Sequence, residues 1–202
     1  MSRPIQRLVL DCHGVVLNDP WPGFLRDCAR RAGRTESTWL TRWRSEWRRD
    51  AWLGRISDGD LWVALHGGSD TLEDWAGALE PRYAPGPAAR WLAEWRDAVP
   101  IVLLTNHRAS WLRPRLARFD LERYFEQILV SDETGEVKPD EAAFRRAAGA
   151  CAPSEVLFVD NALRNVRAAA DAGLQTMLAD RHGGWLAELT DRLLGKGEPC
   201  GM

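Results

Sequence analysis

Three apolar runs in this sequence each end on a polar side chain suited to binding a small molecule or reacting with it. The runs cover residues 8–10, 101–104 and 156–159, and they end on Asp11, Thr105 and Asp160 in turn. Short, continuous apolar runs are typical of strands buried on both faces of a parallel sheet. Because open α/β sheets bind ligands outside the carboxyl ends of their strands, we expect the three side chains to converge on one pocket.

Helical stretches separate the later apolar runs, and this alternation predicts the fold class. It favours a three-layer α/β fold with a Rossmann-like parallel sheet between helices on both faces. Residues 18–96 differ, because they are helical in pattern, rich in arginine, and contain nine of the 11 tryptophans. Trp39, Trp43 and Trp47 recur every four residues, which predicts one helical face packed into a small core.

Four segments together resemble the motifs of the haloacid dehalogenase-like hydrolase superfamily. They are Asp11-Cys-His-Gly14, Thr105-Asn106, Lys138-Pro-Asp140 and Asp160-Asn-Ala-Leu-Arg-Asn165. The resemblance implies that Asp11 is a nucleophile that forms a covalent aspartyl intermediate. It also implies that Thr105 holds a phosphoryl oxygen and that Lys138 neutralises the charge of the reacting groups.

The helical region directly after the first strand resembles the C1 cap of the same superfamily. The resemblance implies an α/β core over residues 1–17 and 97–202 and a helical cap over 18–96. Within the superfamily, the chain looks most similar to phosphatases related to the N-terminal domain of soluble epoxide hydrolases. The shared features are Gly14-Val-Val-Leu17 and Trp52-Leu-Gly-Arg-Ile-Ser57.

Two substitutions depart from the superfamily pattern and bear on the chemistry. His13 stands where phosphate-transferring members have an aspartate that serves as general acid and base. An imidazole, with an ordinary pKa of about 6.5, is suited to take over this proton transfer. Asn161 stands in place of an aspartate that binds Mg²⁺, and it brings an oxygen without a charge. The implied metal ligands are therefore Asp11, His13 through its carbonyl, Asp160 and Asn161, and we expect Mg²⁺ to bind weakly or not at all.

Two residues beside Thr105 are candidate contacts for an anionic substrate. They are Asn106 and Arg108. For Arg108, as for its neighbour His107, the alternative is an ordinary solvated surface position.

The resemblance leaves three functions open. The leading hypothesis is hydrolysis of a small phosphorylated metabolite through Asp11. The second is other chemistry on the same fold, such as dehalogenation, in which a cap arginine binds the substrate carboxylate. The cap offers four such residues: Arg42, Arg44, Arg48 and Arg49. The third is a catalytically attenuated protein whose tryptophan-rich region binds a ligand or partner.

Composition narrows the class of partner. The net charge of -2 provides no basic excess for a nucleic-acid backbone. No apolar stretch approaches about 18 residues, the length of a transmembrane helix, and no signal-peptide pattern is found. The four cysteines lack metal-ligand spacing, which predicts free thiols in a reducing compartment. We therefore expect a cytoplasmic protein with a small anionic substrate, and the oligomeric state stays open.

Overall fold

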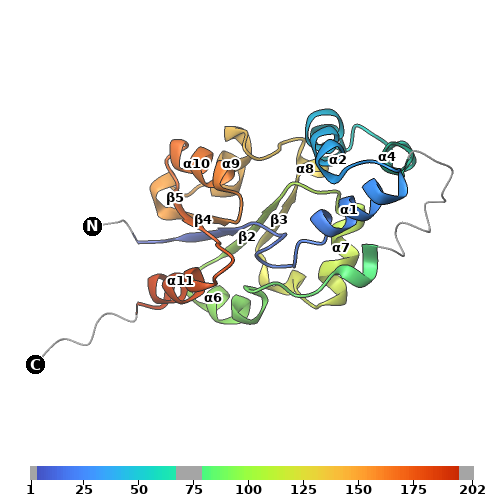
Figure 1. Ribbon diagram of the computed structural model, residues 1–202. Coiled ribbons are helices and arrows are strands. Elements are labelled where there is room, and N and C mark those ends of the chain that lie inside the picture. Colours follow the sequence, from blue (N-terminus) through green and yellow to red (C-terminus); the bar gives the residue numbers. More distant parts are fainter. Residues whose placement is uncertain (1–3, 67–78, 196–202) are drawn as a thin grey trace, which may run out of the picture.

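The structure, a computed structural model, describes residues 4–66 and 79–195. Its centre is a parallel five-stranded sheet with the order β3-β2-β1-β4-β5 (Figure 1). The strands are β1 (Arg7–Leu10), β2 (Ile101–Thr105), β3 (Gln127–Val130), β4 (Val156–Asp160) and β5 (Gln175–Leu178). The predicted fold class is confirmed, and the three apolar runs are the three interior strands.

Helices cover both faces of the sheet and make it the middle of three layers. One face carries α9 (Glu141–Ala148) and α10 (Leu163–Asp171), and the other carries α6 (Leu92–Ala98), α7 (Ala109–Arg118) and α11 (Gly184–Leu194). The side chains of β1 alternate between the two faces: Val9 packs with Phe144 of α9, whereas Leu8 and Leu10 face the opposite cluster. This double burial explains why β1 has no polar residue before Asp11.

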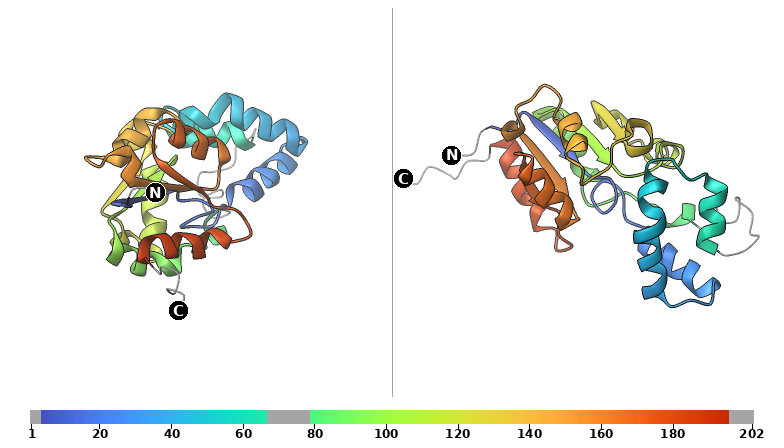
Figure 2. Two further views of the ribbon diagram at one scale, coloured as in Figure 1. Left: turned by 90° about the vertical axis from the view of Figure 1, so that its left-hand side faces the viewer. Right: turned by 90° about the horizontal axis from the view of Figure 1, so that it is seen from above.

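A helical region lies beyond the carboxyl ends of the strands (Figure 2). It contains α1 (Trp21–Arg31), α2 (Glu36–Arg42), the π-helical segment η1 (Trp43–Trp47), α3 (Arg48–Trp52) and α4 (Asp58–His66). Trp39 and Trp43 are buried and Trp47 is half-buried, so the predicted tryptophan face does pack inward. The ring of Trp43 stacks on Trp21 of α1, with 5.4 Å between centroids.

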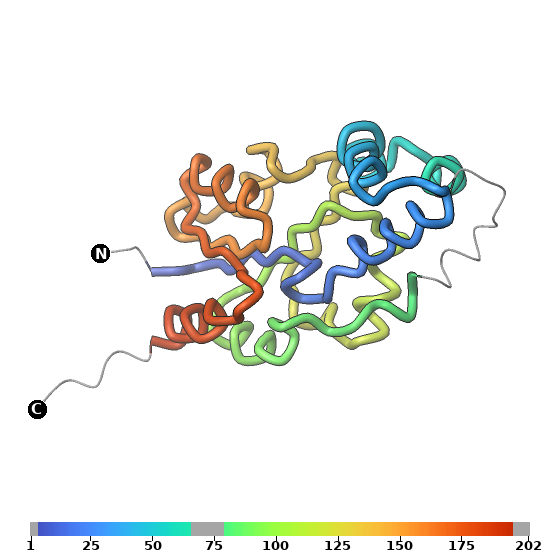
Figure 3. The backbone as a smooth tube through the Cα atoms, viewed as in Figure 1, coloured from blue at the N-terminus to red at the C-terminus, as the bar shows by residue number. Residues whose placement is uncertain are grey.

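The division into a core and a cap over 18–96 stays a proposal, and the structure places its far boundary earlier. Helix α6 packs beside α11 under the sheet, as the tube in Figure 3 also shows. The indole Nε1 of Trp95 donates a hydrogen bond to Thr190 Oγ1 at 3.0 Å. Since α6 contributes to the layers of the core, we end the proposed cap before it.

Short helices connect the remaining elements. They are η2 (Glu80–Arg82), η3 (Ala89–Trp91), η4 (Glu122–Tyr124), α8 (Ser131–Thr134) and η5 (Pro153–Glu155). Within the described ranges, no helix has the length and apolar character needed to cross a bilayer. The expected free thiols are found at Cys12, Cys28 and Cys151, whereas Cys200 lies outside the described residues.

Candidate active site

Asp11 lies at the carboxyl end of the central strand, between the ends of two neighbouring strands. Strand β1 pairs with β2 on one side and with β4 on the other, so Thr105 and Asp160 flank Asp11 at one edge of the sheet. The backbone N–H of Asp11 continues the ladder by donating to the carbonyl of Val159 at 2.9 Å. All three polar side chains are buried and line one cavity. The structure thus brings together the three strand ends singled out in the sequence.

A single buried ammonium group connects the two carboxylates. Lys138 Nζ donates to Asp11 Oδ1 at 2.6 Å and to Asp160 Oδ2 at 2.8 Å. The backbone of Lys138 is fixed on both sides by Asn106, whose Oδ1 accepts from Lys138 N at 2.8 Å and whose Nδ2 donates to its carbonyl at 2.7 Å. Asn106 therefore positions Lys138; it also lines the cavity, and the substrate contact expected from the sequence stays a prediction.

Asp160 is held by its own loop as well as by Lys138. Its Oδ1 accepts a hydrogen bond from the backbone of Ala162 at 2.7 Å, and its Oδ2 accepts one from Asn165 Nδ2 at 2.9 Å. Each carboxylate oxygen therefore has a donor, and the side chain has one fixed orientation.

Burial dominates the electrostatics of this group. It raises the pKa of Asp11 to about 7, helped by the charge of Asp160 and opposed by Lys138. The pKa of Lys138 is also raised, because the two carboxylates outweigh the burial of the ammonium. Lys138 therefore keeps its proton, and Asp11 titrates near neutrality.

The donors expected to hold Mg²⁺ gather at the same edge of the sheet. Asn161 Nδ2 donates to the carbonyl of His13 at 3.0 Å. A Cβ on Gly14 would lie 2.0 Å from that nitrogen, so the approach requires glycine there. The oxygens of Asp11, Asp160 and the His13 carbonyl fit a hard cation, and Asn161 fits once its amide turns Oδ1 inward.

The charge available for a cation is low. Within the described residues, no group of three or more histidine, cysteine, aspartate or glutamate side chains is arranged to hold a metal ion. The two carboxylates already share the Lys138 ammonium. The donor types fit Mg²⁺, and their charge favours weak binding.

The ring of His13 belongs to an aromatic cluster. It stacks on His107 with centroids 4.7 Å apart and tilts against Tyr83 at 5.9 Å. Burial, reinforced by the charges of Lys138 and Arg115, holds the pKa of His13 well below its usual range. The ring is therefore neutral at neutral pH, which speaks against the predicted role as general acid. His107 is itself fully buried, so a solvated position for it is wrong.

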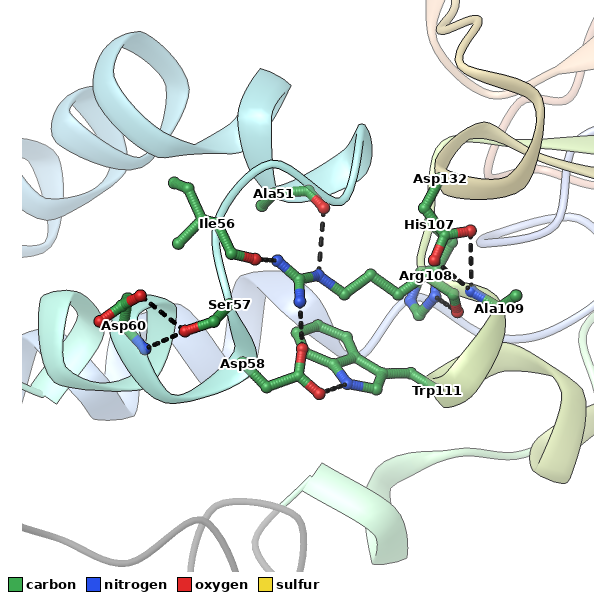
Figure 4. A network of polar contacts seen from close by, with 10 residues as sticks. All are labelled: Ala51, Ile56, Ser57, Asp58, Asp60, His107, Arg108, Ala109, Trp111 and Asp132. Atoms are coloured by element: carbon green, nitrogen blue, oxygen red, sulfur yellow. Dashed lines mark hydrogen bonds and ion pairs between the residues drawn. The ribbon is translucent and has the colours of Figure 1, made fainter.

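Arg108 is also buried and does not line the cavity; its guanidinium points toward Ala51, Ile56 and Asp58 (Figure 4). It donates to the carbonyls of Ala51 and Ile56, pairs with Asp58, and lies over the ring of Trp111. Both expectations for Arg108, a substrate contact and a solvated surface residue, are wrong. The residue instead ties the segment between α3 and α4 to the start of α7.

The cavity has a volume of about 290 Å³ and extends from the strand ends into the helical region. Beyond the residues at the strand ends, the lining combines tryptophan rings with arginines. This part of the lining, called the cavity wall below, also includes one acidic residue, Asp19. The residues of this wall are Trp21, Trp43, Trp52, Arg44, Arg48 and Arg164. The sequence offered Arg44 and Arg48 only among four equivalent cap arginines, and it gave no signal for Arg164 or Trp21.

Sequence comparisons point to one enzyme family. A model described as haloacid dehalogenase-like hydrolase matches residues 79–173. Phosphoglycolate phosphatase 1 of Pseudomonas aeruginosa is 34% identical over 88 residues, which cover 43% of this chain and 32% of that protein. Phosphoglycolate phosphatase of Pseudomonas fluorescens is 30% identical over 115 residues, which cover 54% of this chain and 42% of that protein. The match thus spans less than half the length of these curated relatives.

Solved structures agree over nearly the whole chain. A HAD family enzyme from Bacteroides thetaiotaomicron has a TM-score of 0.76 at 19% identity and covers 93% of this chain and 99% of its own. The L-2-haloacid dehalogenase from Xanthobacter autotrophicus has a TM-score of 0.63 at 23% identity, with 96% and 84% covered. The chain thus resembles haloacid dehalogenase-like hydrolases in sequence over residues 79–173, and it shares the fold of these structures.

The solved structures that resemble this chain include enzymes named for two chemistries. The structures include a complex of the Bacteroides enzyme with magnesium and inorganic phosphate, as well as dehalogenases. At these identities the likeness shows the fold alone. The choice between the two chemistries has to come from the residues at the strand ends.

Proposed function

We propose that this chain hydrolyses a small phosphate monoester through a phosphoaspartyl intermediate on Asp11. The observation that carries the proposal is the buried ammonium of Lys138, bonded to Asp11 and Asp160 at the base of the cavity. A fixed positive charge there balances the nucleophile and then the charge that develops on the phosphoryl group. The curated relatives named phosphoglycolate phosphatases support the same reaction class.

The reaction has two displacements at phosphorus. We assign the attack to Asp11 Oδ2, because Oδ1 accepts the bond from Lys138. The new Asp11–phosphorus bond forms as the ester P–O bond breaks, and the leaving group departs as an alkoxide that takes its proton from solvent water. Water then attacks the same phosphorus and breaks the bond to Asp11, which restores the carboxylate; the proton of the water leaves with the inorganic phosphate or passes to solvent. Lys138 and the hydroxyl of Thr105 hold the phosphoryl oxygens through both steps.

Two further groups have supporting roles in the proposal. Mg²⁺, when bound by the oxygens of Asp11, Asp160, His13 and Asn161, would neutralise charge on the phosphoryl group. The neutral ring of His13 supplies no proton to the leaving alcohol, so we assign His13 its carbonyl and its packing rather than acid catalysis. Substrates whose leaving group departs without a proton are then favoured.

One observation favours a second candidate, displacement at carbon by Asp11. A halide leaves without a proton, which suits a site whose His13 is neutral and whose cavity wall carries arginines for a carboxylate. The distinguishing result is halide release from 2-chloropropionate in the absence of Mg²⁺.

Beryllofluoride tests the phosphatase proposal without a guess about the substrate. Bound to an aspartate, it mimics the phosphoaspartyl group. With Mg²⁺ and beryllofluoride at about 100 times its dissociation constant, we expect the melting temperature to rise by about 5–10 °C. The Asp11→Asn variant should show no such rise. Asp19→Asn, which changes another carboxylate of the cavity, should keep it. A folded wild type without a shift, or a shift retained in Asp11→Asn, would overturn the proposal.

A further inference from the structure

Three arginines of the cavity wall have no partner within the described residues. Arg44 comes from η1, Arg48 from α3 and Arg164 from α10, so the helical region and the core both contribute. In the part of the chain that the structure describes, none of the three forms an ion pair or a hydrogen bond through its guanidinium. Three cations that line one cavity without forming an ion pair favour the binding of an anion.

Three acidic residues are engaged by other arginines: Glu46 by Arg42 at 3.1 Å, Asp140 by Arg49 at 2.6 Å, and Asp50 by Arg55 at 3.5 Å. Asp19, which lines the cavity, accepts a hydrogen bond from the backbone N–H of Trp21 at 3.1 Å instead of pairing with an arginine. Arg44 and Arg48 thus stay unmatched beside arginines of the same helical region that are paired.

Arg48 lies close enough to Arg44 and Arg164 to be repelled by both. The pKa of Arg48 is lowered, first by burial and then by the charges of Arg164 and Arg44. Arg48 is half-buried whereas Arg44 and Arg164 are exposed, so water screens part of this repulsion. A bound anion would relieve the repulsion.

Aromatic side chains share the cavity with these cations and with Asp11. The rings of Trp21, Trp43 and Trp52 line it, and the indole Nε1 of Trp21 is buried without a hydrogen-bond partner in the described part of the chain. At about 290 Å³, the cavity lies at the lower end of the range for small-molecule sites, roughly 300–1,000 Å³. It suits a small metabolite.

We propose that Arg44, Arg48 and Arg164 bind a second anionic group, a carboxylate or a phosphate, of a small organic phosphate. The inference rests on the proposed function, which puts the first phosphoryl group at Asp11. The substrate class is then a short dianionic metabolite, with its charged ends separated by a linker against the tryptophans. The arginines recognise the end of the substrate that does not react.

Matched ligands can test this recognition in the Asp11→Asn variant, which blocks turnover. The ligands are butyl phosphate, 4-phosphonooxybutanoate and butane-1,4-diol bisphosphate, with two- and three-carbon analogues to vary the length. Calorimetry should show at least one second-anion ligand binding about 10- to 100-fold more tightly than its alkyl phosphate. Comparison of the carboxylate with the bisphosphate identifies the preferred anion.

Arginine variants in the same background locate the effect. Arg48→Gln and Arg164→Gln should remove most of this preference, because they weaken the second-anion ligands far more than butyl phosphate. Arg167→Gln is the control, because Arg167 is exposed on the same helix and does not line the cavity. It should keep the preference.

The outcomes separate the two proposals. Equal weakening of all ligands, or the same effect in Arg167→Gln, overturns the second anion site and leaves the phosphatase proposal standing. An arginine-dependent preference in a protein that ignores beryllofluoride supports the anion site and rejects the phosphatase. Failure of every phosphate ligand to bind overturns both.

Discussion

Two parts of the cavity lining, which we call its two walls, differ in whether their charged side chains are paired. At the sheet edge, Lys138 bonds to Asp11 and Asp160, and Asn165 fixes Asp160 further. The second wall, as we call the part of the lining formed by Arg44, Arg48 and Arg164 with the tryptophans, has arginines that form no ion pair among the described residues. The first wall is organised before any ligand arrives, as catalysis requires. The second gains its partner only when a ligand binds.

Arg108 shows that an unmatched arginine is not a general property of this chain. It is buried, and its guanidinium finds Asp58 and the carbonyls of Ala51 and Ile56. The chain therefore pairs a buried arginine where structure requires it. The contrast is specific: this chain pairs its buried Arg108, whereas Arg44, Arg48 and Arg164 line the cavity without an ion pair among the described residues.

The sharpest test of the contrast is the stability of one variant from each wall. Lys138→Met leaves two buried carboxylates facing each other, so we expect the free energy of unfolding to fall by about 3–5 kcal/mol near pH 7. Arg164→Gln removes a charge with no partner, and we expect a change within about 0.5 kcal/mol. Urea denaturation of both variants measures the difference.

A double variant identifies the cause of the Lys138 effect. Adding Asp11→Asn to Lys138→Met removes the repulsion between the carboxylates, so part of the lost stability should return. Equal losses of unfolding free energy in Lys138→Met and Arg164→Gln would contradict the distinction between a paired and an unpaired wall.

The pH dependence of stability should follow Asp11. Its pKa in the folded protein, about 7, lies above its ordinary value of 3.8. The stability that comes from protonated Asp11 is therefore complete below about pH 4 and lost as the pH rises to 7. Relative to Asp11→Asn, the wild type should lose up to about 1.4 kcal/mol per pH unit over this interval.

Denaturation of the two proteins at half-unit steps from pH 4.5 to 8 checks this slope. Asp27→Asn is a control of opposite sign, because Arg82 and Arg30 lower the pKa of Asp27. Its contribution changes only below about pH 4, so no slope is expected in the same interval. A wild type that gains stability toward pH 7 relative to Asp11→Asn would mean that Lys138 outweighs burial.

The sequence predicted the strands that are completely buried and missed the two outermost strands of the sheet. The interior strands β1, β2 and β4 are continuous apolar runs, and each was predicted. The edge strands β3 and β5 were not, because Gln127 is exposed and Gln175 and Thr176 are only half-buried. Half-buried strands of four residues leave too short a pattern to recognise.

The same division applies to the site. Thr105 and Asp160 could be placed beside Asp11 because adjacent parallel strands end at one edge. The role of Arg108 could not be predicted from the sequence, because its partners Ala51 and Asp58 lie 57 and 50 residues away in the chain. Among the cap arginines, Glu46 four residues after Arg42 was a readable sign that Arg42 is paired, whereas the pairing of Arg49 depends on tertiary structure.

The smallest expected effect concerns His13. The question is whether its ring takes part in catalysis together with Asp11 and Lys138. His13→Phe keeps the stacking on His107 and Tyr83 and removes a buried Nε2 that has no partner within the described residues. We expect turnover of p-nitrophenyl phosphate and butyl phosphate to change less than about 10-fold. A general acid or base would instead be worth about 10²–10⁴.

The two substrates separate packing from proton transfer. If His13 donates a proton, His13→Phe should slow butyl phosphate far more than p-nitrophenyl phosphate, because only the alkoxide needs that proton to leave. If His13 only packs, both rates should respond alike, and His13→Ala should lower the melting temperature more than His13→Phe does. A selective loss with butyl phosphate would identify His13 as a general acid. It would also show that the ring gains a proton when the negatively charged substrate binds.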